Sequence, residues 1–532
     1  MADQASQRSG WTPERSAAGE RSPWLITGII SIATFMTVLD STIVNVSLPH
    51  IAGNLGTSIR ESTWVLTSFL IATAIVIPIS GWLSDVVGRK RYYMISVALF
   101  TGASVACALA PNIEVLIFFR IIQGIGGGGL APSEQSMLAD SFPPEKRGMA
   151  FAAYAVVVVV GPILGPVVGG YITDAASWHW IFLVNLPFGA LSLFLVGMFV
   201  VEPEIIERER QERWRQGLSI DLIGLALVAI GLGSLTYVLA EGQSDNWFSS
   251  QTIVIGSILA VTSLAALVWW ELRHPNPIVP LRLLGNRQFA IVVLIMFLVG
   301  VILFGTTQVI PQMYQEIFGY TAFKAGLALT LGGLGILLVM PLAGRLAGNV
   351  DPRLMLVPGF LALAFGLHHF TTLTPQVTFW DLSFARLLQT FALPFVFVTV
   401  NTIAYLDIPA DKSNDASALL NVFRSIGGSV GISFSQTILA RNGQTHQSQL
   451  TEHLNQLNPN LVDLLERARS LGLPEDAALG MLYGEVVRQA QFLAYLDVYR
   501  IVTFGILAVV PLCLLLHGEK NTAGKARAPV PA

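Results

Sequence analysis

The sequence predicts an all-α protein that crosses a membrane many times. Of its 532 residues, 53% are hydrophobic and 12% are charged, roughly half the charged fraction of an ordinary soluble domain. The mean hydropathy is +0.63. Apolar stretches of about 20 residues, the length at which a helix crosses a bilayer, recur along the chain. We predict about fourteen such helices, at residues 24–46, 63–83, 92–110, 113–138, 148–172, 178–201, 219–240, 251–271, 288–310, 322–346, 354–374, 379–405, 416–440 and 497–518.

The positions of lysine and arginine predict how these helices are oriented. With the N-terminus placed in the cytoplasm, the short loops on the opposite side contain only Arg60 and Lys324. Basic residues bias short loops toward the cytoplasmic face, so we expect both termini inside the cell. The bases on that side are Arg89, Lys90, Arg91, Lys146, Arg147, Arg208, Arg210, Arg213, Arg215, Arg273, Arg282, Arg287, Arg345, Arg353, Lys412, Lys520, Lys525 and Arg527.

Charge, cysteine content and motifs argue against several classes of function. The net charge of −3 and the pI near 6.3 give no general basic surface, so we expect no nucleic acid partner. Cys107 and Cys513 lie far apart in apolar stretches and predict buried thiols rather than a disulfide or a metal site. The run Gly124–Gly129 lacks the Lys-Ser/Thr ending of a nucleotide-binding loop. We therefore expect neither ATP drive, nor a cofactor, nor an enzyme.

An internal repeat divides the chain into two similar halves. A shift of 266 positions aligns, without a gap, Arg120 with Arg386, Gln123 with Gln389, Pro143 with Pro409, Lys146 with Lys412, Gly161 with Gly427 and Gly165 with Gly431. Duplicated halves are typical of transporters, whose binding site lies where the halves meet. We predict a cytoplasmic tail (1–23), a first six-helix bundle (24–201), an inserted helix pair (219–271), a second six-helix bundle (288–518) with an extracytoplasmic segment (441–496), and a cytoplasmic tail (519–532). Short amphipathic helices are expected in that segment, at Leu461–Leu465 and after Pro474.

Asp40 lies within the first apolar stretch, where an ionisable group is costly. A charged aspartate at the bilayer centre costs at least ~2.5–3.5 kcal/mol, so such a residue pairs with another group, faces water or takes up a proton. All three suit a transporter. The alternative is a purely structural hydrogen bond between Asp40 and a neighbouring helix.

The fourth predicted helix carries a polar stripe opposite this aspartate. At 3.6 residues per turn, one face holds Arg120, Gln123, Gly124, Gly127, Ala131 and Glu134. Arg120 and Asp40 both lie ~13 Å from the outer ends of their helices, so an ion pair is geometrically possible. Glu134 lies ~21 Å further toward the cytoplasm, where burial would favour its neutral form, and it is a second candidate proton carrier. The alternatives are a structural Arg120 that donates to backbone carbonyls and a solvated Glu134 at the cytoplasmic exit.

Five ordered motifs resemble those of a known transporter family. Gly81–Arg91 looks like the loop between the second and third helices of the major facilitator superfamily, and Arg120-x-x-Gln123-Gly124 resembles its fourth-helix motif. Gly161–Gly170 resembles the fifth-helix antiporter motif. Leu39–Pro49 and Trp178–Pro187 are similar to the fourteen-helix drug:proton antiporters of the EmrB/QacA family. The likeness is greatest to the EmrB branch and covers nearly the whole chain.

The resemblance implies a major facilitator fold with two inserted helices, placed in the bacterial inner membrane. It implies export of hydrophobic or amphipathic drugs in exchange for protons, with the proton gradient as the energy source. We expect Asp40, Arg120 and Glu134 to couple protons. The candidate lining of the substrate cavity consists of polar residues within apolar helices, which are Asn45, Gln123, Gln135, Gln308, Arg386, Asn421 and Arg424.

Two of the motifs imply conformational roles. In the superfamily, Gly81, Asp85, Gly88 and Arg89 belong to a pattern that resembles a cytoplasmic latch between states. The bases of this turn orient the protein in the membrane in either case. The fifth-helix motif resembles a pivot and seal between the halves, and its residues are Gly161, Pro162, Gly165, Pro166 and Gly169. Close helix packing alone would also require these glycines.

The EmrB type implies a periplasmic membrane-fusion adaptor (EmrA-like) and an outer-membrane channel (TolC-like) as partners. The segment 441–496 is large enough to offer a docking surface, since loops beyond ~12–15 residues usually have a function or are disordered. A QacA-like pump that works alone, or a loop that merely joins two helices, is the alternative. For the function itself, the alternatives are a dedicated exporter of a metabolite, fatty acid or siderophore, and a membrane sensor or channel. No soluble signalling domain supports the latter.

Overall fold

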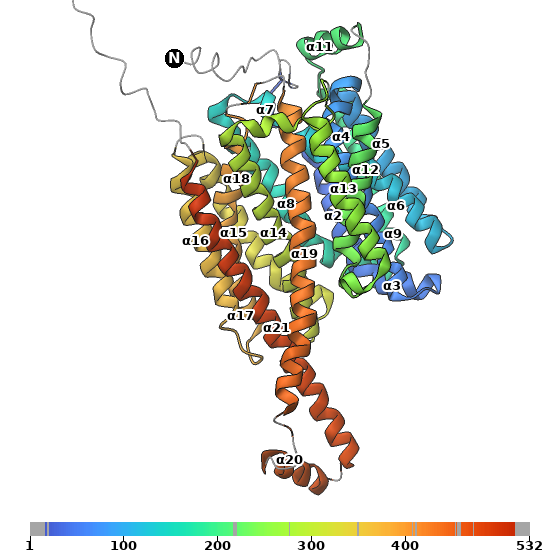
Figure 1. Cartoon of the computed structure of the whole chain (residues 1–532), viewed down its shortest axis with the longest axis vertical. Helices are drawn as coiled ribbons and strands as arrows, with labels where there is room; N and C mark the ends of the chain where they lie inside the picture. The colour runs from blue at the N-terminus through green and yellow to red at the C-terminus, as the bar shows by residue number, and fades with distance from the viewer. Residues whose placement is uncertain are drawn as a thin grey trace, which may run out of the picture.

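The computed structural model is a bundle of long helices that run in roughly one common direction (Figure 1). It describes residues 16, 18, 21–215, 221–275, 277–347, 350–406, 408–409, 412–452, 454, 459–471 and 473–516. Within these ranges the regular structure is helical, and no β-strand occurs. The same residues contain 12 helices that are long and apolar enough to cross a membrane. The protein is a multi-pass membrane protein.

These twelve helices match twelve of the fourteen predicted spans. The remaining two predictions, 92–110 and 416–440, correspond to α5 (Arg89–Ala108) and α19 (Ser413–Glu452). Both pack against neighbouring membrane helices, α5 against α6 and α19 against α14. Their lower hydropathy sets them apart, since α5 opens with three bases and α19 is rich in polar residues. The count of fourteen spans therefore stays a prediction.

We call the helices up to Phe199 the first half of the protein. They are α2 (Pro23–Leu55), α3 (Ile59–Ser62), α4 (Trp64–Val87), α5, α6 (Ile113–Gly128), α7 (Leu130–Ser141), α8 (Pro144–Ala175), α9 (His179–Leu183) and α10 (Asn185–Phe199). The fourth predicted span is interrupted at Gly129, between α6 and α7. The polar stripe expected along one helix thus runs over two helical segments, with Arg120 on α6 and Glu134 on α7.

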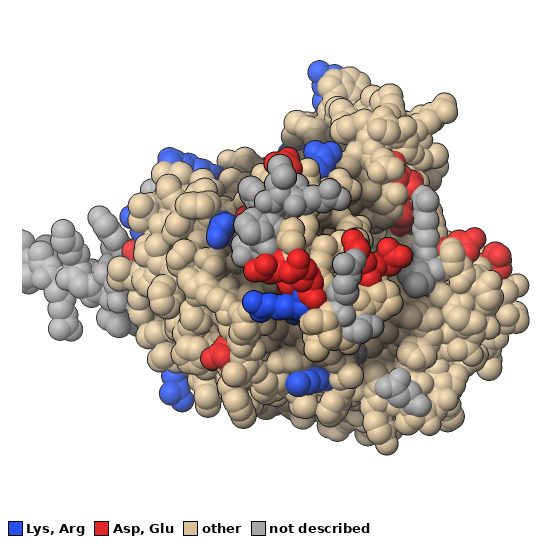
Figure 2. All heavy atoms as spheres, turned by 90° about the horizontal axis from the view of Figure 1, so that it is seen from below, with Lys and Arg blue, Asp and Glu red and all other residues tan. Residues whose placement is uncertain are grey.

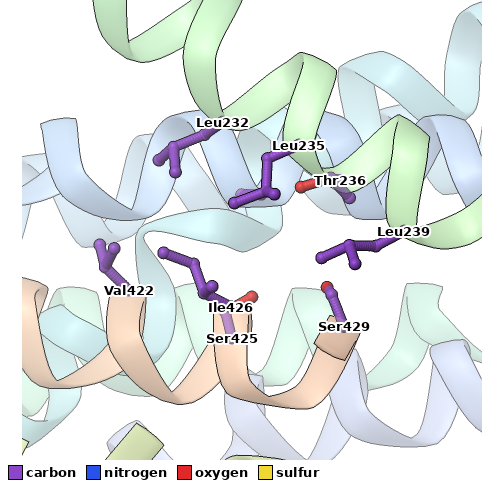
Figure 3. A pocket seen from close by; sticks show the side chains of 9 residues that line it. Leu232, Leu235, Thr236, Leu239, Val422, Ser425, Ile426 and Ser429 are labelled. Carbon is purple, nitrogen blue, oxygen red and sulfur yellow. The ribbon is translucent and has the colours of Figure 1, made fainter. Parts of the chain in front are cut away.

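The inserted helices cover the seam between the two halves. After α11 (Glu204–Arg215) come α12 (Leu222–Glu241), η2 (Trp247–Ser249) and α13 (Gln251–Glu271). Helix α12 packs on α13 and also on α4 and α19, which belong to different halves. Figure 3 shows a pocket at this junction, where Leu235 and Thr236 of α12 lie opposite Ile426 and Ser429 of α19.

The second half begins after the inserted pair. It consists of η3 (Leu281–Gly285), α14 (Arg287–Glu316), α15 (Ala322–Ala347), α16 (Pro352–Phe370), α17 (Phe379–Thr390), α18 (Leu393–Ile403), α19, α20 (Pro459–Ser470) and α21 (Glu475–Leu514). The halves meet where α8 packs on α15 and α4 packs on α19. The approach is close, because a Cβ added to Gly344 of α15 would lie 2.8 Å from the Cβ of Ala152 on α8.

The predicted extracytoplasmic segment differs from the expected set of short helices. Helices α19 and α21 have 40 residues each and continue beyond the bundle as a hairpin that carries α20, at the bottom of Figure 1. Helix α20 contains the predicted Leu461–Leu465, and α21 begins directly after Pro474. Polar contacts join α19 to α21 where the hairpin leaves the bundle. There His446 Nε2 and Asn442 Nδ2 of α19 lie 2.7 and 2.9 Å from Asp497 Oδ2 of α21. These contacts let both helices extend without a break.

Candidate functional site

A buried ion pair joins α2 to α6. Arg120 Nη1 donates to Asp40 Oδ2 at 2.7 Å, and neither side chain has any exposed surface. The equal depth of the two residues predicted that a pair was possible, and the structure brings them together. Such a pair holds two ionisable groups against each other, away from the protein surface.

Other polar side chains complete the surroundings of Asp40. Gln123 Nε2 and Asn185 Nδ2 donate to Asp40 Oδ1 at 3.0 and 2.7 Å. Both amides also donate to Ser104 Oγ, at 3.2 and 2.8 Å. With Arg120, the carboxylate accepts three hydrogen bonds, which offset much of the cost of removing it from water.

Arg120 combines the two roles that the sequence left open. Besides its bond to Asp40, its Nε donates to the backbone carbonyl of Val65 at 3.0 Å. Its guanidinium carbon lies 4.2 Å from the ring centre of Phe69 and 5.8 Å from that of Phe182. Arg120 is therefore both the counter-ion of Asp40 and a structural donor to α4.

Two members of this network, Asn185 and Ser104, were not predicted from the sequence as site residues. Asn185 is the first residue of α10, 145 positions away from Asp40. Its position in the motif Trp178–Pro187 is the one signal in the sequence that points to it. Gln123 was predicted to line the substrate cavity, whereas the structure buries it completely within the ion-pair network.

Glu134 lies in a separate buried cluster on α7. Thr34 Oγ1 of α2 donates to Glu134 Oε2, and Tyr154 OH of α8 lies 3.3 Å from the same hydroxyl. Within the described residues, Glu134 Oε1 has no hydrogen-bond partner, and the side chain has no exposed surface. A neutral carboxyl group fits this environment better than a carboxylate, which would need more donors.

Four of the predicted cavity residues connect the two halves. A fifth, Arg424, contacts one of them from the same helix. Asn421 Nδ2 of α19 donates to Gln135 Oε1 of α7 at 2.8 Å, and Arg424 Nη2 donates to Asn421 Oδ1 at 2.5 Å. At a second level of the bundle, Asn45 Nδ2 of α2 donates to Gln308 Oε1 of α14 at 3.4 Å. Polar side chains from both halves therefore meet inside the bundle at two levels.

The last predicted cavity residue, Arg386, lies in the second half at the place that Arg120 takes in the first. Arg386 Nη1 donates to Gln389 Oε1 at 2.5 Å, and Gln389 Nε2 donates to Thr306 Oγ1 at 3.3 Å. The shift of 266 positions that aligns Arg120 with Arg386 also aligns Asp40 with Thr306. The second half thus repeats the network with a neutral residue where the first half has its acid.

The predicted latch connects α4 and α5 to α19. Asn414 Nδ2 of α19 donates to Asp85 Oδ1 at 2.6 Å. Arg89 forms its ion pair with Asp140 of α7, and Ser413 Oγ donates to Asp140 Oδ2 at 3.1 Å. The sequence placed Asp85 among the neighbouring bases, but the structure shows that the polar contacts reach across to the second half.

Two glycines make this latch possible. A Cβ added to Gly81 would lie 3.3 Å from Asp415 Oδ1, so α19 approaches α4 more closely than most side chains permit. Gly88 ends α4 with φ of 99°, which favours glycine, and a Cβ there would lie 2.5 Å from Arg210 Nη1. Both positions of the predicted motif therefore have a steric reason.

The fifth-helix glycines of α8 face α2 and not the second half. An added Cβ would lie 2.6 Å from Val38 Cγ1 at Gly161, 1.9 Å from Thr42 Oγ1 at Gly165 and 3.1 Å from Ile43 Cγ2 at Gly169. Pro162 and Pro166 lie within the same helix. The opposite contact of α8, with α15, is the one that joins the halves. The glycine face therefore fixes α2, which carries Asp40, against the helix at the seam.

In the described part of the chain, no three His, Cys, Asp or Glu side chains are grouped to hold a metal ion.

Comparisons with known proteins give a consistent family. Residues 30–432 match the family model described as the Major Facilitator Superfamily.

Two relatives cover most of the chain. The chain is 38% identical to the multidrug export protein EmrB of Haemophilus influenzae over 91% of this chain and 94% of the relative. It is 31% identical to the fatty acid resistance protein FarB of Neisseria gonorrhoeae, over 94% and 97%. Among solved structures, the human organic anion transporter TETRAN aligns over 91% of this chain and 99% of its own, with a TM-score of 0.59. At 13% identity that likeness shows the fold alone.

Proposed function

The chain belongs to the major facilitator superfamily, and we propose that it is a proton-coupled multidrug exporter of the EmrB type. The name of the relative that matches over nine-tenths of the chain supports multidrug export. The charge asymmetry of the loops supports an inner-membrane orientation with both termini in the cytoplasm. The observation that carries the coupling is the ion pair between Asp40 and Arg120, which is buried without any exposed surface.

The coupling step is a competition between a proton and Arg120 for the carboxylate of Asp40. In this conformation Arg120, Gln123 and Asn185 all donate to Asp40, so these donors compete with a proton for the carboxylate. A movement of α2 away from α6 would remove Arg120 and Gln123, and the carboxylate, left without its counter-ion, then takes up a proton. Proton binding and release are thus tied to the relative positions of two helices.

Movement of α2 is tied in turn to the rest of the first half. The glycines of α8 hold α2 closely, and α8 packs on α15 of the second half. A displacement of α8 at the contact with α15 would therefore shift α2, and with it Asp40, relative to α6. This is the arrangement that alternating access requires, in which a fixed site is opened to each side in turn.

Glu134 provides a second site for a proton closer to the cytoplasmic end. Its carboxyl group is buried, and Thr34 donates a hydrogen bond to Oε2. Because it lies beside Gln135, which contacts Asn421 of the second half, separation of the halves would change its surroundings. We propose that Glu134 carries a proton that a cationic drug can replace.

The latch supports assignment of this conformation as closed on the cytoplasmic side. Asp85 and Asn414 join the halves there, and Phe151 and Tyr405 stack across the same seam with ring centres 5.6 Å apart. Opening toward the cytoplasm must break these contacts. The latch therefore sets part of the energy difference between the two states.

The long hairpin formed by α19 and α21 is the proposed docking surface for a periplasmic adaptor that leads to an outer-membrane channel. It projects beyond the other helices, and acidic side chains gather near the centre of the face seen from that end in Figure 2. The segment contributes Glu452, Asp463, Glu466, Glu475, Asp476 and Glu485 against Arg441, Arg467, Arg469 and Arg488, so it is acidic on balance. A partner with a basic surface would complement them.

A dedicated fatty-acid exporter of the same fold is the second candidate, because one relative is named a fatty acid resistance protein. Everted membrane vesicles distinguish the two. After a proton gradient is formed, structurally unrelated hydrophobic drugs should each release part of it in vesicles that contain the protein. If only fatty acids caused release, the protein would be a dedicated exporter; if no compound did, proton-coupled export would be excluded.

A further inference from the structure

In the described part of the second half, a half-buried arginine lacks the counter-ion that its repeat partner has. In the first half, Arg120 is neutralised by Asp40 and its Nε donates to the carbonyl of Val65. In the second half, Thr306 stands in place of the acid. Among the described residues, Arg386 forms no ion pair, and its buried Nε has no hydrogen-bond partner.

The free edge of Arg386 has the geometry that binds an anion. Its one hydrogen bond within the described chain uses Nη1, which donates to Gln389. Within the described residues, the edge formed by Nε and Nη2 therefore makes no hydrogen bond and could act as a two-pronged donor. Such a fork matches the paired oxygens of a carboxylate, sulfonate or phosphate.

The surroundings of Arg386 do not supply the missing negative charge. Tyr314 and Tyr499 are the titratable groups that interact with it electrostatically. Their hydroxyl groups donate elsewhere, Tyr314 to the carbonyl of Leu382 at 2.9 Å and Tyr499 to Met313 Sδ at 3.5 Å. Arginine stays protonated in proteins, so its positive charge is not compensated by these two tyrosines.

The same comparison of the halves indicates what accompanies the anion. Ser104, which supports the amides beside Asp40, aligns with Phe370 in the second half. The ring of Phe370 lies 5.1 Å from that of Tyr499. The second half therefore has an aromatic side chain where the first half has the serine that supports the amides beside Asp40, which suits a ligand with an apolar body next to its charged group.

We propose that Arg386 binds the negatively charged head group of amphipathic substrates, with the Nε–Nη2 edge as donor and the aromatic side chains of Tyr499 and Phe370 near the apolar part. The second half thus uses the repeated arginine for the substrate, while the first half uses its own for the proton. This inference deepens the proposed export function and rests on it.

A pair of matched probes tests the assignment. Decane-1-sulfonate is permanently anionic, and decyl methyl sulfone has the same chain with a neutral head group. Binding of each probe to the purified protein in lipid nanodiscs is measured by calorimetry. Arg386→Gln should weaken sulfonate binding at least tenfold and change sulfone binding less than twofold, and Arg386→Lys should recover part of the loss because it restores charge without the fork.

A second variant uses the repeat itself and keeps the test open if Arg386→Gln fails to fold. Thr306→Asp places an acid where the first half has Asp40, so it should pair with Arg386 and remove sulfonate binding while sulfone binding persists. Arg441→Gln removes an exposed charge on α19 and serves as the control, with no change expected for either probe.

The outcomes separate this inference from the proposed function. If Arg386→Gln and Thr306→Asp leave sulfonate binding unchanged, or weaken both probes equally, the anion site is wrong while export stands. If the unmodified protein binds neither probe and releases no proton gradient with any drug, the proposed function fails and the anion site fails with it.

Discussion

Arg120 Nη1 and Asp40 Oδ2 lie 2.7 Å apart in a part of the bundle that has no exposed surface. Removing one partner of such a pair costs about 3–5 kcal/mol, because the other charge is then left buried alone. A proton that binds Asp40 in this conformation has to compete with Arg120 for the carboxylate. The pair therefore prevents a proton from binding until the helices have moved, which is the condition for coupling without leak.

Asn185 should tune the proton affinity of this pair. Asn185→Ala removes one donor to the carboxylate, a bond of the kind worth roughly 1.5–3 kcal/mol. The pH profile of drug export should then shift upward, because a proton no longer competes with this donor for the carboxylate. Asn401→Ala is the control, because Asn401 is also fully buried but donates to Phe397 of its own helix. Equal shifts in both variants would mean that Asn185 has only a structural role.

The glycine face of α8 should be sensitive to a single methyl group. At Gly165 an added Cβ would lie 1.9 Å from Thr42 Oγ1 and 2.6 Å from Thr42 Cβ, so the clash is not relieved by a small rotation. Gly165→Ala should destabilise the protein by about 1–3 kcal/mol and lower its unfolding temperature. Gly170→Ala on the same helix should not, since nothing lies within 4 Å of that position. Equal unfolding temperatures for the two variants would contradict the packing of α8 on α2.

The latch predicts a shift between conformations. Asn414→Ala removes the 2.6 Å hydrogen bond to Asp85 and should favour the state that is open to the cytoplasm by about tenfold or more. Spin labels are attached at positions 91 and 354, which are exposed and lie in different halves, after both native cysteines have been replaced. Electron paramagnetic resonance should then measure a longer distance between the two labels in the variant. Glu114→Gln should leave the distances unchanged. A latch variant with unchanged distances would show that these contacts do not hold the halves together.

The hairpin should be dispensable for transport and required for assembly. Replacing residues 450–480 by a short Gly/Ser linker keeps the contact of His446 with Asp497 and the hydrogen bond between Gln447 and Tyr483. Drug-induced proton release in vesicles should persist, whereas co-purification of the adaptor and resistance of whole cells should be lost. If the adaptor still bound, its docking surface would have to lie elsewhere, with α12 and α13 the next surface to test.

Much of the ion-pair site was predictable because membrane helices are regular. Residues at equal depth on facing polar stripes can meet, and this regularity alone predicts that Asp40 can pair with Arg120. The repeat of 266 positions aligns Arg386 and Gln389 with Arg120 and Gln123, and in the structure each arginine donates to its glutamine. Both inferences use position along a helix, which the sequence contains.

The rest depended on which helices are neighbours, which spacing does not reveal. Asn185 reaches Asp40 only because α10 packs on α2, and the glycines of α8 face α2 rather than the second half for the same kind of reason. The break at Gly129 was missed because hydrophobic and small residues on both sides of it continue the helical pattern. The hairpin was expected as short helices because its composition is polar, although contacts such as His446 with Asp497 stabilise two long ones.

The central claim is that Asp40 carries the transported proton, and proton release by Asp40→Asn vesicles tests it most directly. The variant should fold, insert and bind drugs, and drug addition should release no more of a preformed proton gradient than it does in vesicles without the protein. Release equal to that of the unmodified protein would contradict the claim and move the proton to another group, with Glu134 the first to examine.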